Sequence, residues 1–226
     1  MLHVVDNFLG DSSLADDIRA DSNFFPTEME GLNFGEKANL YHSEMTGHLS
    51  FMFWEGWWRS PANTLKKKLI QRIWQSVNIM GYSLNEIAGF EYWARTFLPG
   101  QYLAPHVDED TFAYQENRSF RAPAIGCVWY GFTSSPGNGF LELHEGRIEG
   151  NPSNALERES IVGLLSPPEK RERLSYRPDR LIVFDSGRRI HETTPSTEGE
   201  RKVLVVNMWL KNEAPLGLAL NKFFIE

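Results

Sequence analysis

Much of the chain after Gly89 consists of short apolar runs separated by turn-forming residues. The runs are rich in β-branched and aromatic residues, and they cover residues 90–98, 125–133, 140–144, 180–185 and 202–210. Gly, Pro, Asn and Ser cluster between them, and these residues favour turns. Many short strands without intervening helices are typical of an antiparallel β-sandwich, jelly roll or barrel. The sequence therefore predicts a mainly β core.

The residues before this region carry the signals of one short strand and a helix. Residues 3–9 are apolar with an acidic break and are expected to form the strand. Asp11 or Ser12 can cap the helix, because a side-chain oxygen there accepts a hydrogen bond from a free backbone N–H of the first turn. We expect this helix to extend to about Ser22.

A second helix is predicted to begin at Ser60-Pro61. A capping hydroxyl followed by Pro is a common helix start, because Pro lacks the N–H that would be unpaired at the first helical position. Apolar residues then recur at every fourth position, at Leu65, Leu69, Ile73 and Val77. Gly81 is the expected end. The two helices predict an α+β protein in which N-terminal helices support a β core.

A charged, Pro-containing segment interrupts the series of strands. It covers residues 145–179, and a connection of that length is usually functional or flexible. We expect a surface insertion there, with a short helix near residues 154–165. The predicted organisation is a single domain over 1–226, with helical support in 1–88 and the β core in 89–226.

Charge and cysteine content exclude several classes of protein. The chain has 23 Lys+Arg against 30 Asp+Glu, and its net charge of −7 disfavours binding to nucleic acid through a general positive field. No run approaches the roughly 18 apolar residues that a membrane span needs, and the N-terminus lacks the pattern of a secretory signal. Cys127 is the only cysteine, which excludes an intrachain disulfide. We therefore expect a protein of the reducing cytoplasm.

His106-Val-Asp108 is the first candidate for chemistry. In an extended segment, residues i and i+2 point to the same side, so the imidazole and the carboxylate can meet at one metal ion. The pair by itself is weak evidence, because this spacing also arises by chance. The alternative is a histidine at a strand end beside a solvated aspartate.

A second set of candidates lies around the last two apolar runs. His191 follows the run 180–185, and Arg201 lies ten residues after His191, at the start of the run 202–210. We expect these two runs to be antiparallel neighbours. That pairing would place His191 and Arg201 near the same end of one sheet, with the arginine reaching inward.

Two histidines and one carboxylate, here His106, Asp108 and His191, make the facial triad typical of non-heme Fe(II) oxygenases. Ligands on one face of the metal leave positions for a 2-oxo acid, which binds through its carboxylate and keto oxygens, and for O₂. If the acid has a second carboxylate, a buried guanidinium is its natural bidentate partner. Arg201 fits that role.

With these motifs the chain resembles the Fe(II)/2-oxoglutarate-dependent dioxygenases, and among them the prolyl-4-hydroxylase-like branch. Residues 100–108 resemble the family's iron-binding strand with its preceding turn. Residues 138–143 resemble its Gly-Gly-x-Leu segment, and residues 180–209 resemble its C-terminal hairpin with the second histidine and the basic residue. The resemblance extends over nearly the whole chain.

The resemblance implies a fold, a ligand set and a reaction. The expected fold is a double-stranded β-helix, or jelly roll. The expected ligands of Fe(II) are His106, Asp108 and His191, and Arg201 is expected to bind the distal carboxylate of 2-oxoglutarate. The reaction is hydroxylation of an unactivated C–H bond with release of succinate and CO₂, and ascorbate is a candidate reductant.

Two positions depart from the family's pattern. The family often has a Ser or Thr two residues after the arginine, where its hydroxyl binds the same carboxylate, and this chain has Val203. Tyr130 is the candidate for binding 2-oxoglutarate in its place, with a tyrosine at the edge of the core as the alternative. A tyrosine that often precedes the iron histidine is also absent, and Tyr92 and Arg95 are both open as its replacement.

Other polar and aromatic residues receive structural interpretations. We expect ordinary surface or edge positions for His42, His48 and His144. Core packing or a contact between helix and sheet is favoured over a substrate cleft for Trp54, Trp57 and Trp58. A role next to the metal and a role as solvated turn residues are both open for Glu109 and Asp110.

The substrate is less constrained than the reaction. By similarity, a prolyl residue of a protein is the leading candidate, followed by an amino-acid-like small molecule. Oxidative demethylation of nucleic acid is disfavoured, because enzymes of that type carry a second arginine six residues after the first, where this chain has Asn207. A metal-binding jelly roll without activity would not need Arg201, and a cupin would more often have a His-x-His pair, which this chain lacks.

Overall fold

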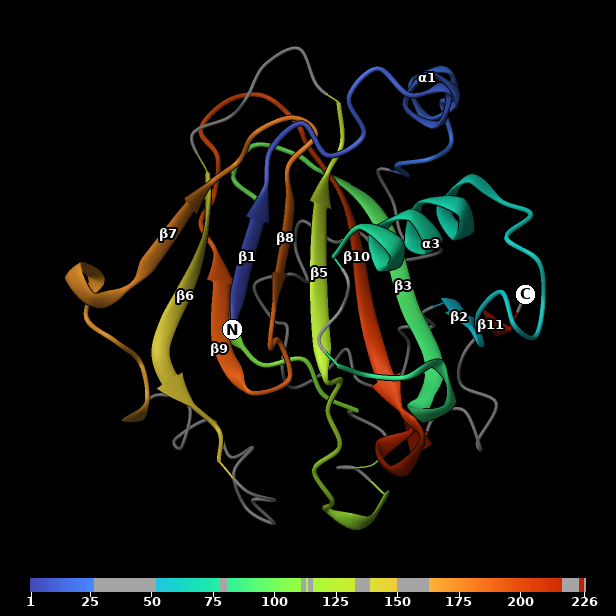
Figure 1. Ribbon diagram of the computed structural model, residues 1–226. Helices are drawn as coiled ribbons and strands as arrows, with labels where there is room; N and C mark the ends of the chain where they lie inside the picture. The colour runs from blue at the N-terminus through green and yellow to red at the C-terminus, as the bar shows by residue number, and fades with distance from the viewer. Residues whose placement is uncertain are drawn as a thin grey trace.

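Two packed β-sheets form the body of the protein (Figure 1). This computed structural model describes residues 1–26, 52–77, 81–110, 113, 116–132, 139–149, 163–216 and 224–225. Within these residues the larger sheet has the strand order β1-β8-β5-β10-β3-β2-β11, and the smaller sheet has the order β4-β9-β6-β7. Neighbouring strands are antiparallel, except that β11 runs parallel to β2.

The strands and helices have the following residue bounds. The larger sheet contains β1 (Leu2–Val5), β2 (Met52–Trp54), β3 (Ile87–Phe97), β5 (Ile125–Tyr130), β8 (Leu181–Phe184), β10 (Arg201–Leu210) and β11 (Phe224–Ile225). The smaller sheet contains β4 (Leu103–His106), β6 (Phe140–Arg147), β7 (Glu172–Ser175) and β9 (Arg189–Thr193). The helices are α1 (Ser13–Ala20) and α3 (Leu65–Val77), with short 3₁₀ turns η2 (Leu84–Glu86), η3 (Pro168–Lys170) and η4 (Lys211–Glu213). No helix in the described ranges has the length and apolarity to cross a membrane.

The first predicted helix is confirmed, while the strand before it is shorter than expected. Ser12 caps α1, and its hydroxyl accepts a hydrogen bond from the backbone N–H of Ala15 (3.3 Å). The strand β1 ends at Val5 because the chain turns at Asn7, which has a positive φ of 54° that Asn tolerates better than most residues.

The helix α3 begins at Leu65, later than predicted. Thr64 provides the cap, since its hydroxyl accepts a hydrogen bond from the N–H of Lys67 (3.3 Å). The hydroxyl of Ser60 instead accepts a hydrogen bond from the indole N–H of Trp54 (2.8 Å), and residues 61–64 are not helical. The predicted helix start at Ser60-Pro61 was therefore wrong.

One face of the larger sheet is covered by helices (Figure 1). Leu69, Ile70 and Ile73 of α3 are each at most 2% exposed, and they belong to the same apolar cluster as Leu204 and Val206 of β10. Burying a side chain of this size contributes about 1.5–3 kcal/mol. Packing on the sheet therefore stabilises the helix more than its own hydrogen bonds do.

The tryptophans before α3 belong to this helix-facing layer. The ring centroids of Trp54, Trp57 and Trp58 each lie 6.0 Å from that of Phe90 in β3. Trp74 of α3 completes the cluster at 5.9 Å from Phe90. The prediction that these tryptophans pack against the sheet is confirmed.

Strand β10 is buried on both faces because it lies between two apolar layers. Leu204 and Val206 point toward the helices, while Val203 points toward the smaller sheet and packs with Leu141 and Leu143 of β6. Alternate residues of a strand point to opposite faces. This double burial explains why the run 202–210 is almost continuously apolar.

The expected pairing of the last two apolar runs was wrong. Strand β5 lies between β8 and β10 and pairs with both. After β8 the chain passes to the smaller sheet, forms β9, and returns to the larger sheet as β10. Two neighbouring runs in the sequence are therefore separated in space, because the segment between them supplies a strand to the other sheet.

Two further differences concern the expected insertion and the N-terminal region. Residues 145–179 contain η3 and also β7, which pairs with β6 at the edge of the smaller sheet, so part of this segment belongs to the β core. Most of the helix expected near residues 154–165 lies outside the described residues. The region 1–88 supplies β1 and β2 to the larger sheet in addition to its helices.

Candidate metal centre

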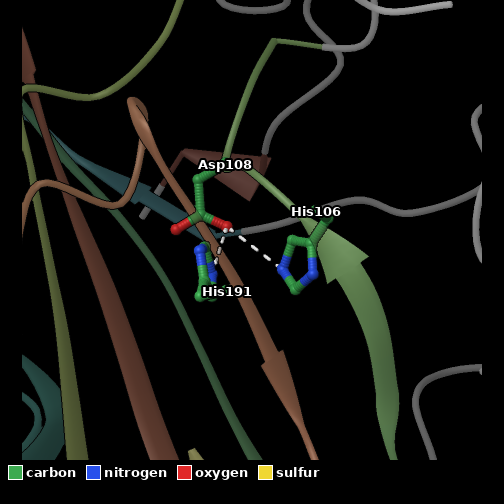
Figure 2. A group of neighbouring side chains, drawn as sticks. All are labelled: His106, Asp108 and His191. Carbon is green, nitrogen blue, oxygen red and sulfur yellow. Dashed lines mark ion pairs between the residues drawn. The ribbon is translucent and has the colours of Figure 1, made fainter. Parts of the chain in front are cut away.

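Three candidate ligands meet at the end of the smaller sheet. His106 is the last residue of β4, Asp108 follows two residues later, and His191 lies in β9 directly opposite His106. One ligand atom of each residue lies within 4.8 Å of the other two. The carboxylate of Asp108 faces both rings, and its Oδ1 is 3.7 Å from each Nε2 (Figure 2). The predicted convergence of the three side chains is confirmed.

Backbone carbonyls fix the orientation of both imidazole rings. Nδ1 of His106 lies 2.7 Å from the carbonyl oxygen of Ala104, and Nδ1 of His191 lies 3.0 Å from that of Arg189. Because a carbonyl oxygen only accepts hydrogen bonds, each Nδ1 carries the proton and donates. The lone pairs of the Nε2 atoms therefore face Asp108, an arrangement that a shared cation stabilises.

The surroundings of His106 favour the neutral imidazole, which is the form that binds a cation. Burial lowers its pKa from the ordinary value to about 4, and the ring of His191, with its centroid 4.2 Å away, adds to the shift. The imidazole is therefore neutral near pH 7. A metal ion does not have to displace a proton from it, which favours binding.

The backbone of the third ligand is tied to the larger sheet. The N–H of Asp108 donates a hydrogen bond to the carbonyl oxygen of Ser186 (3.0 Å), and Ser186 follows β8 and is fully buried. The carboxylate thus projects from a held position although Asp108 lies outside any strand. Two imidazole nitrogens and one carboxylate oxygen on one side suit a divalent transition metal with open positions.

Arg201 reaches the same pocket from the larger sheet. It is only 3% exposed and lies at the start of β10. Its Nη1 donates to the carbonyl oxygen of Thr194 (3.3 Å), and its Nη2 donates to the hydroxyl of Thr193 (3.2 Å). Burial lowers its pKa, but a guanidinium remains charged near pH 7.

The positive charge of Arg201 has no anionic partner in the described part of the chain. The groups that act on it electrostatically are the hydroxyls of Tyr130 and Tyr176, and no described carboxylate lies within ion-pair distance. A buried charge without a counter-charge costs several kcal/mol. An anionic ligand in the pocket would remove that cost, so this site fits a carboxylate.

A pocket that is partly open to solvent connects the three candidate metal ligands with Arg201. Its walls include the three candidate ligands, Arg201 and Tyr130, and also apolar side chains from both sheets such as Leu141 and Val203. This mixture of apolar walls with few polar groups is typical of small-molecule sites. Tyr130 is 1% exposed, and burial raises the pKa of its hydroxyl.

The two residues left open on β3, Tyr92 and Arg95, lie on opposite faces of the strand. Tyr92 packs in the helix-facing cluster and lies away from the pocket. Arg95 lies on the pocket-facing side of the strand, with its guanidinium carbon 5.5 Å from the centroid of the Phe97 ring. Of the described residues of β3, Trp93 and Phe97 line the pocket. Neither Tyr92 nor Arg95 is among the side chains that line the pocket.

Sequence reasoning missed Thr193. It lies two residues after His191 on the same face of β9 and lines the pocket. The spacing of two residues on a strand was the available signal, but it was applied only to His106 and Asp108. Val203, where a hydroxyl was sought, is an apolar wall of the pocket.

Gly139 lies against the backbone of Thr194, next to the guanidinium of Arg201. A Cβ at this position would lie 3.1 Å from the carbonyl oxygen of Thr194 and 3.4 Å from Nη1 of Arg201. The first distance is shorter than ordinary van der Waals contact. The glycine in the segment 138–143 therefore has a packing reason, which is the close approach of the Thr194 carbonyl oxygen.

Several other residues have structural roles. Asp110 is buried and accepts hydrogen bonds from the backbone N–H groups of Ala113 and Leu216. Burial raises the pKa of Glu109 to about 8. His144 is fully buried on the outer side of the smaller sheet, so the prediction of an ordinary surface or edge histidine was wrong. His42 and His48 lie outside the described residues.

Comparison with known proteins gives the fold. No protein-family model and no curated protein matches this sequence. A prolyl hydroxylase from Trichoplax adhaerens, solved with a hypoxia inducible factor oxygen degradation domain peptide fragment, matches with a TM-score of 0.51 at 15% identity, over 94% of this chain and 84% of that one. A prolyl-4-hydroxylase from Pseudomonas putida matches with a TM-score of 0.46 at 15% identity, over 92% and 87% of the two chains. The first likeness confirms the predicted jelly-roll architecture.

Proposed function

We propose that this protein is an Fe(II)- and 2-oxoglutarate-dependent dioxygenase that hydroxylates an unactivated C–H bond. One observation carries the proposal: a two-histidine, one-carboxylate site shares its pocket with buried Arg201, which has no carboxylate partner among the described residues. A protein that only held a cation would have no use for this guanidinium. A dicarboxylic 2-oxo acid would bind the metal ion with one end and Arg201 with the other.

The residues of this pocket fit both Fe(II) and 2-oxoglutarate. His106, Asp108 and His191 would hold Fe(II), with the two Nδ1–H bonds to carbonyl oxygens keeping the rings in place. Arg201 would bind the distal carboxylate of 2-oxoglutarate with the charge-assisted hydrogen bonds that a guanidinium provides. Tyr130 lines the same pocket and is our candidate for a further hydroxyl contact to 2-oxoglutarate.

When bound, Fe(II) and 2-oxoglutarate supply the oxidative chemistry: one oxygen atom of O₂ enters succinate as CO₂ is lost, and the other enters the hydroxylated product. The protein contributes position and shelter. Phe184 packs edge-on against the ring of His191, with the centroids 4.9 Å apart. Together with Leu141 and Val203 it lines the pocket with apolar surface, which excludes water from the reaction. Ascorbate is our candidate for keeping the iron reduced.

We propose a peptidyl proline as the leading substrate and an amino-acid-like small molecule as the second candidate. The Trichoplax adhaerens enzyme of similar fold was solved with a peptide, which supports the first. We also propose the reducing cytoplasm as the location. The single thiol of the protein, that of Cys127, is buried in the larger sheet. Burial raises the pKa of this thiol to about 12, so the thiol is unreactive toward oxidants.

Succinate release in the presence of Fe(II), ascorbate and 2-oxoglutarate tests the proposal. We expect wild type to form succinate, and His106→Ala to lose both iron binding and succinate formation. Arg201→Ala should keep iron binding but raise KM for 2-oxoglutarate roughly 10- to 150-fold, because a hydrogen bond to a charged group contributes about 1.5–3 kcal/mol. His3→Ala, which changes an exposed histidine of β1, is the matched control and should behave as wild type.

Two outcomes would contradict the proposal. Wild type that binds neither Fe(II) nor 2-oxoglutarate would exclude the enzyme, and iron binding without any 2-oxoglutarate binding would favour a metal-binding protein without this activity. Equal loss of iron affinity in His106→Ala and Arg201→Ala would contradict the separate roles assigned to the two residues.

A further inference from the structure

The hydroxyl of Thr193 lies between the two sheets, next to Arg201. Its Oγ1 accepts a hydrogen bond from the backbone N–H of Leu103 in β4 (2.8 Å). It accepts a second hydrogen bond from Nη2 of Arg201 in β10 (3.2 Å). The side chain also lines the pocket.

The hydroxyl of Thr193 has a hydrogen-bond donor that its two hydrogen bonds do not use. A threonine hydroxyl has two acceptor lone pairs and one donor. An amide N–H and a guanidinium N–H can only donate, so Leu103 and Arg201 occupy both lone pairs. The O–H proton therefore has to point elsewhere, and no described residue accepts it. The oxygen is held from two sides while its donor remains available to the pocket.

A donor in this place matches the unpaired charge of Arg201. Arg201 offers positive charge and N–H groups to an anion, and the hydroxyl of Thr193 offers an O–H from within hydrogen-bond distance of the guanidinium. Both donors can therefore reach one carboxylate. On Arg201's own strand, the pocket-lining residue two positions further on is Val203, which has no donor.

We propose that Thr193 is a cosubstrate-binding residue, whose hydroxyl donates a hydrogen bond to the distal carboxylate of 2-oxoglutarate beside Arg201. This inference rests on the function proposed above. Thr193 thereby supplies from β9 the hydroxyl that Val203 does not supply from β10.

The pairing of β4 with β9 links this contact to the metal ligands. Leu103 lies opposite Thr193, and His106 lies opposite His191. Two residues along a strand are about 6.6 Å apart, so the strand pair sets the separation between the metal ligands and the carboxylate donor.

Calorimetric binding to the Mn(II)-loaded protein under nitrogen tests the inference without turnover. The probes are 2-oxoglutarate and 2-oxobutyrate, which has the same metal-binding end but no distal carboxylate. We expect Thr193→Val to weaken 2-oxoglutarate binding roughly tenfold and to leave the binding of Mn(II) and 2-oxobutyrate unchanged. Thr193→Ser keeps the hydroxyl and should bind 2-oxoglutarate within about threefold of wild type.

A second variant separates a direct contact from an indirect effect on Arg201. Thr193→Val combined with Val203→Thr places a hydroxyl at a different pocket-lining position, on β10 two residues after Arg201. We expect this double variant to regain most of the lost affinity for 2-oxoglutarate. If Thr193 served only to hold Arg201 or Leu103 in place, the added hydroxyl would restore nothing, and that result would overturn the inference.

Three other results of the binding experiment would overturn either the inference about Thr193 or the proposed function. Equal 2-oxoglutarate affinity in wild type and Thr193→Val would overturn the inference while leaving the proposed function intact. A parallel loss of 2-oxobutyrate or Mn(II) binding would assign Thr193 a structural role in the β4–β9 pair and would also overturn it. Failure of wild type to bind 2-oxoglutarate would instead refute the proposed function.

Discussion

Single residues set the position of Asp108, the third candidate metal ligand, and Gly126 of β5 is the clearest case. A Cβ at this position would lie 2.2 Å from Oγ and 2.4 Å from Cβ of Ser186. Ser186 is fully buried, and its carbonyl oxygen holds the N–H of Asp108. Ser186 therefore cannot move away from a larger side chain without moving the backbone of Asp108.

Gly126→Ala is expected to lower the free energy of unfolding by about 1–3 kcal/mol, the usual cost of overpacking a core. It should also weaken Mn(II) binding, because the displaced Ser186 shifts Asp108. Thermal unfolding and a Mn(II) titration measure the two effects. Adding Ser186→Gly removes the clashing atoms and should restore part of both. Unchanged stability and metal affinity in Gly126→Ala would show that the contact is not tight.

At the scale of elements, a buried polar cluster attaches the segment after residue 163 to the outer face of the smaller sheet. His144 of β6 is its centre: Nδ1 accepts a hydrogen bond from the N–H of Ser166 (3.0 Å), and Nε2 lies 3.1 Å from Oε1 of Glu192 in β9. Arg171 donates to both Glu192 (2.7 Å) and Glu142 (2.8 Å). The ring must be neutral with its proton on Nε2, because Nδ1 acts as an acceptor.

This cluster predicts that acid weakens the fold. Burial is the largest cause that lowers the pKa of His144, with Arg171 acting in the same direction and Glu192 and Glu142 opposing it. The unfolded chain therefore takes up a proton, at a pKa of about 6.5, that the folded chain binds less well. The stabilising contribution of His144 is complete above that pH and decreases as the pH falls below it.

Urea unfolding of wild type and His144→Gln between pH 8 and pH 5 measures this contribution. At pH 8 we expect the variant to be less stable by about 1–2 kcal/mol, because it loses buried hydrogen bonds. The difference should shrink toward pH 5, since only wild type loses stability through this histidine. His3→Gln changes an exposed histidine and should follow wild type at every pH. A constant difference between wild type and His144→Gln would contradict the assignment.

At the scale of the whole molecule, the proposed site extends across both sheets. His106, His191 and Thr193 lie on strands of the smaller sheet, whereas Arg201 and Tyr130 lie on the larger one. The apolar cluster between the sheets contains Tyr130 and lies next to these groups. A metal ion by itself contacts residues at one sheet, while a bound dicarboxylate would join the two.

Metal and cosubstrate should therefore stabilise the protein in two separate steps. A ligand at 100 times its Kd adds about 2.7 kcal/mol, and each kcal/mol raises Tm by roughly 2–4 °C in a chain of this size. We expect Mn(II) to raise Tm by roughly 5–10 °C and 2-oxoglutarate to raise it again by a similar amount. Differential scanning calorimetry measures both shifts. Arg201→Ala should keep the first shift and lose most of the second, and an undiminished second shift would rule out a bridging role for Arg201.

Local patterns in the sequence were sufficient for much of the fold and for selecting the three candidate metal ligands. The apolar runs predicted β3, β5, β6, β8 and β10, and the cap at Ser12 predicted α1, because alternation and capping depend only on neighbouring residues. The convergence of His106 with Asp108 follows from their spacing on an extended segment. Arg201 was recognised from its distance to His191 and from the chemistry of a dicarboxylate.

The sequence by itself thus determined the kinds of strands and the residue types of the site, while the tertiary structure decided which strands are neighbours. The order β8-β5-β10, the burial of His144 and the position of Thr193 beside Arg201 all depend on pairing between distant segments. Leu103 and Thr193, for example, are 90 residues apart in the chain. Such pairing follows from how both faces of each strand are buried in the complete molecule, and no local pattern encodes it.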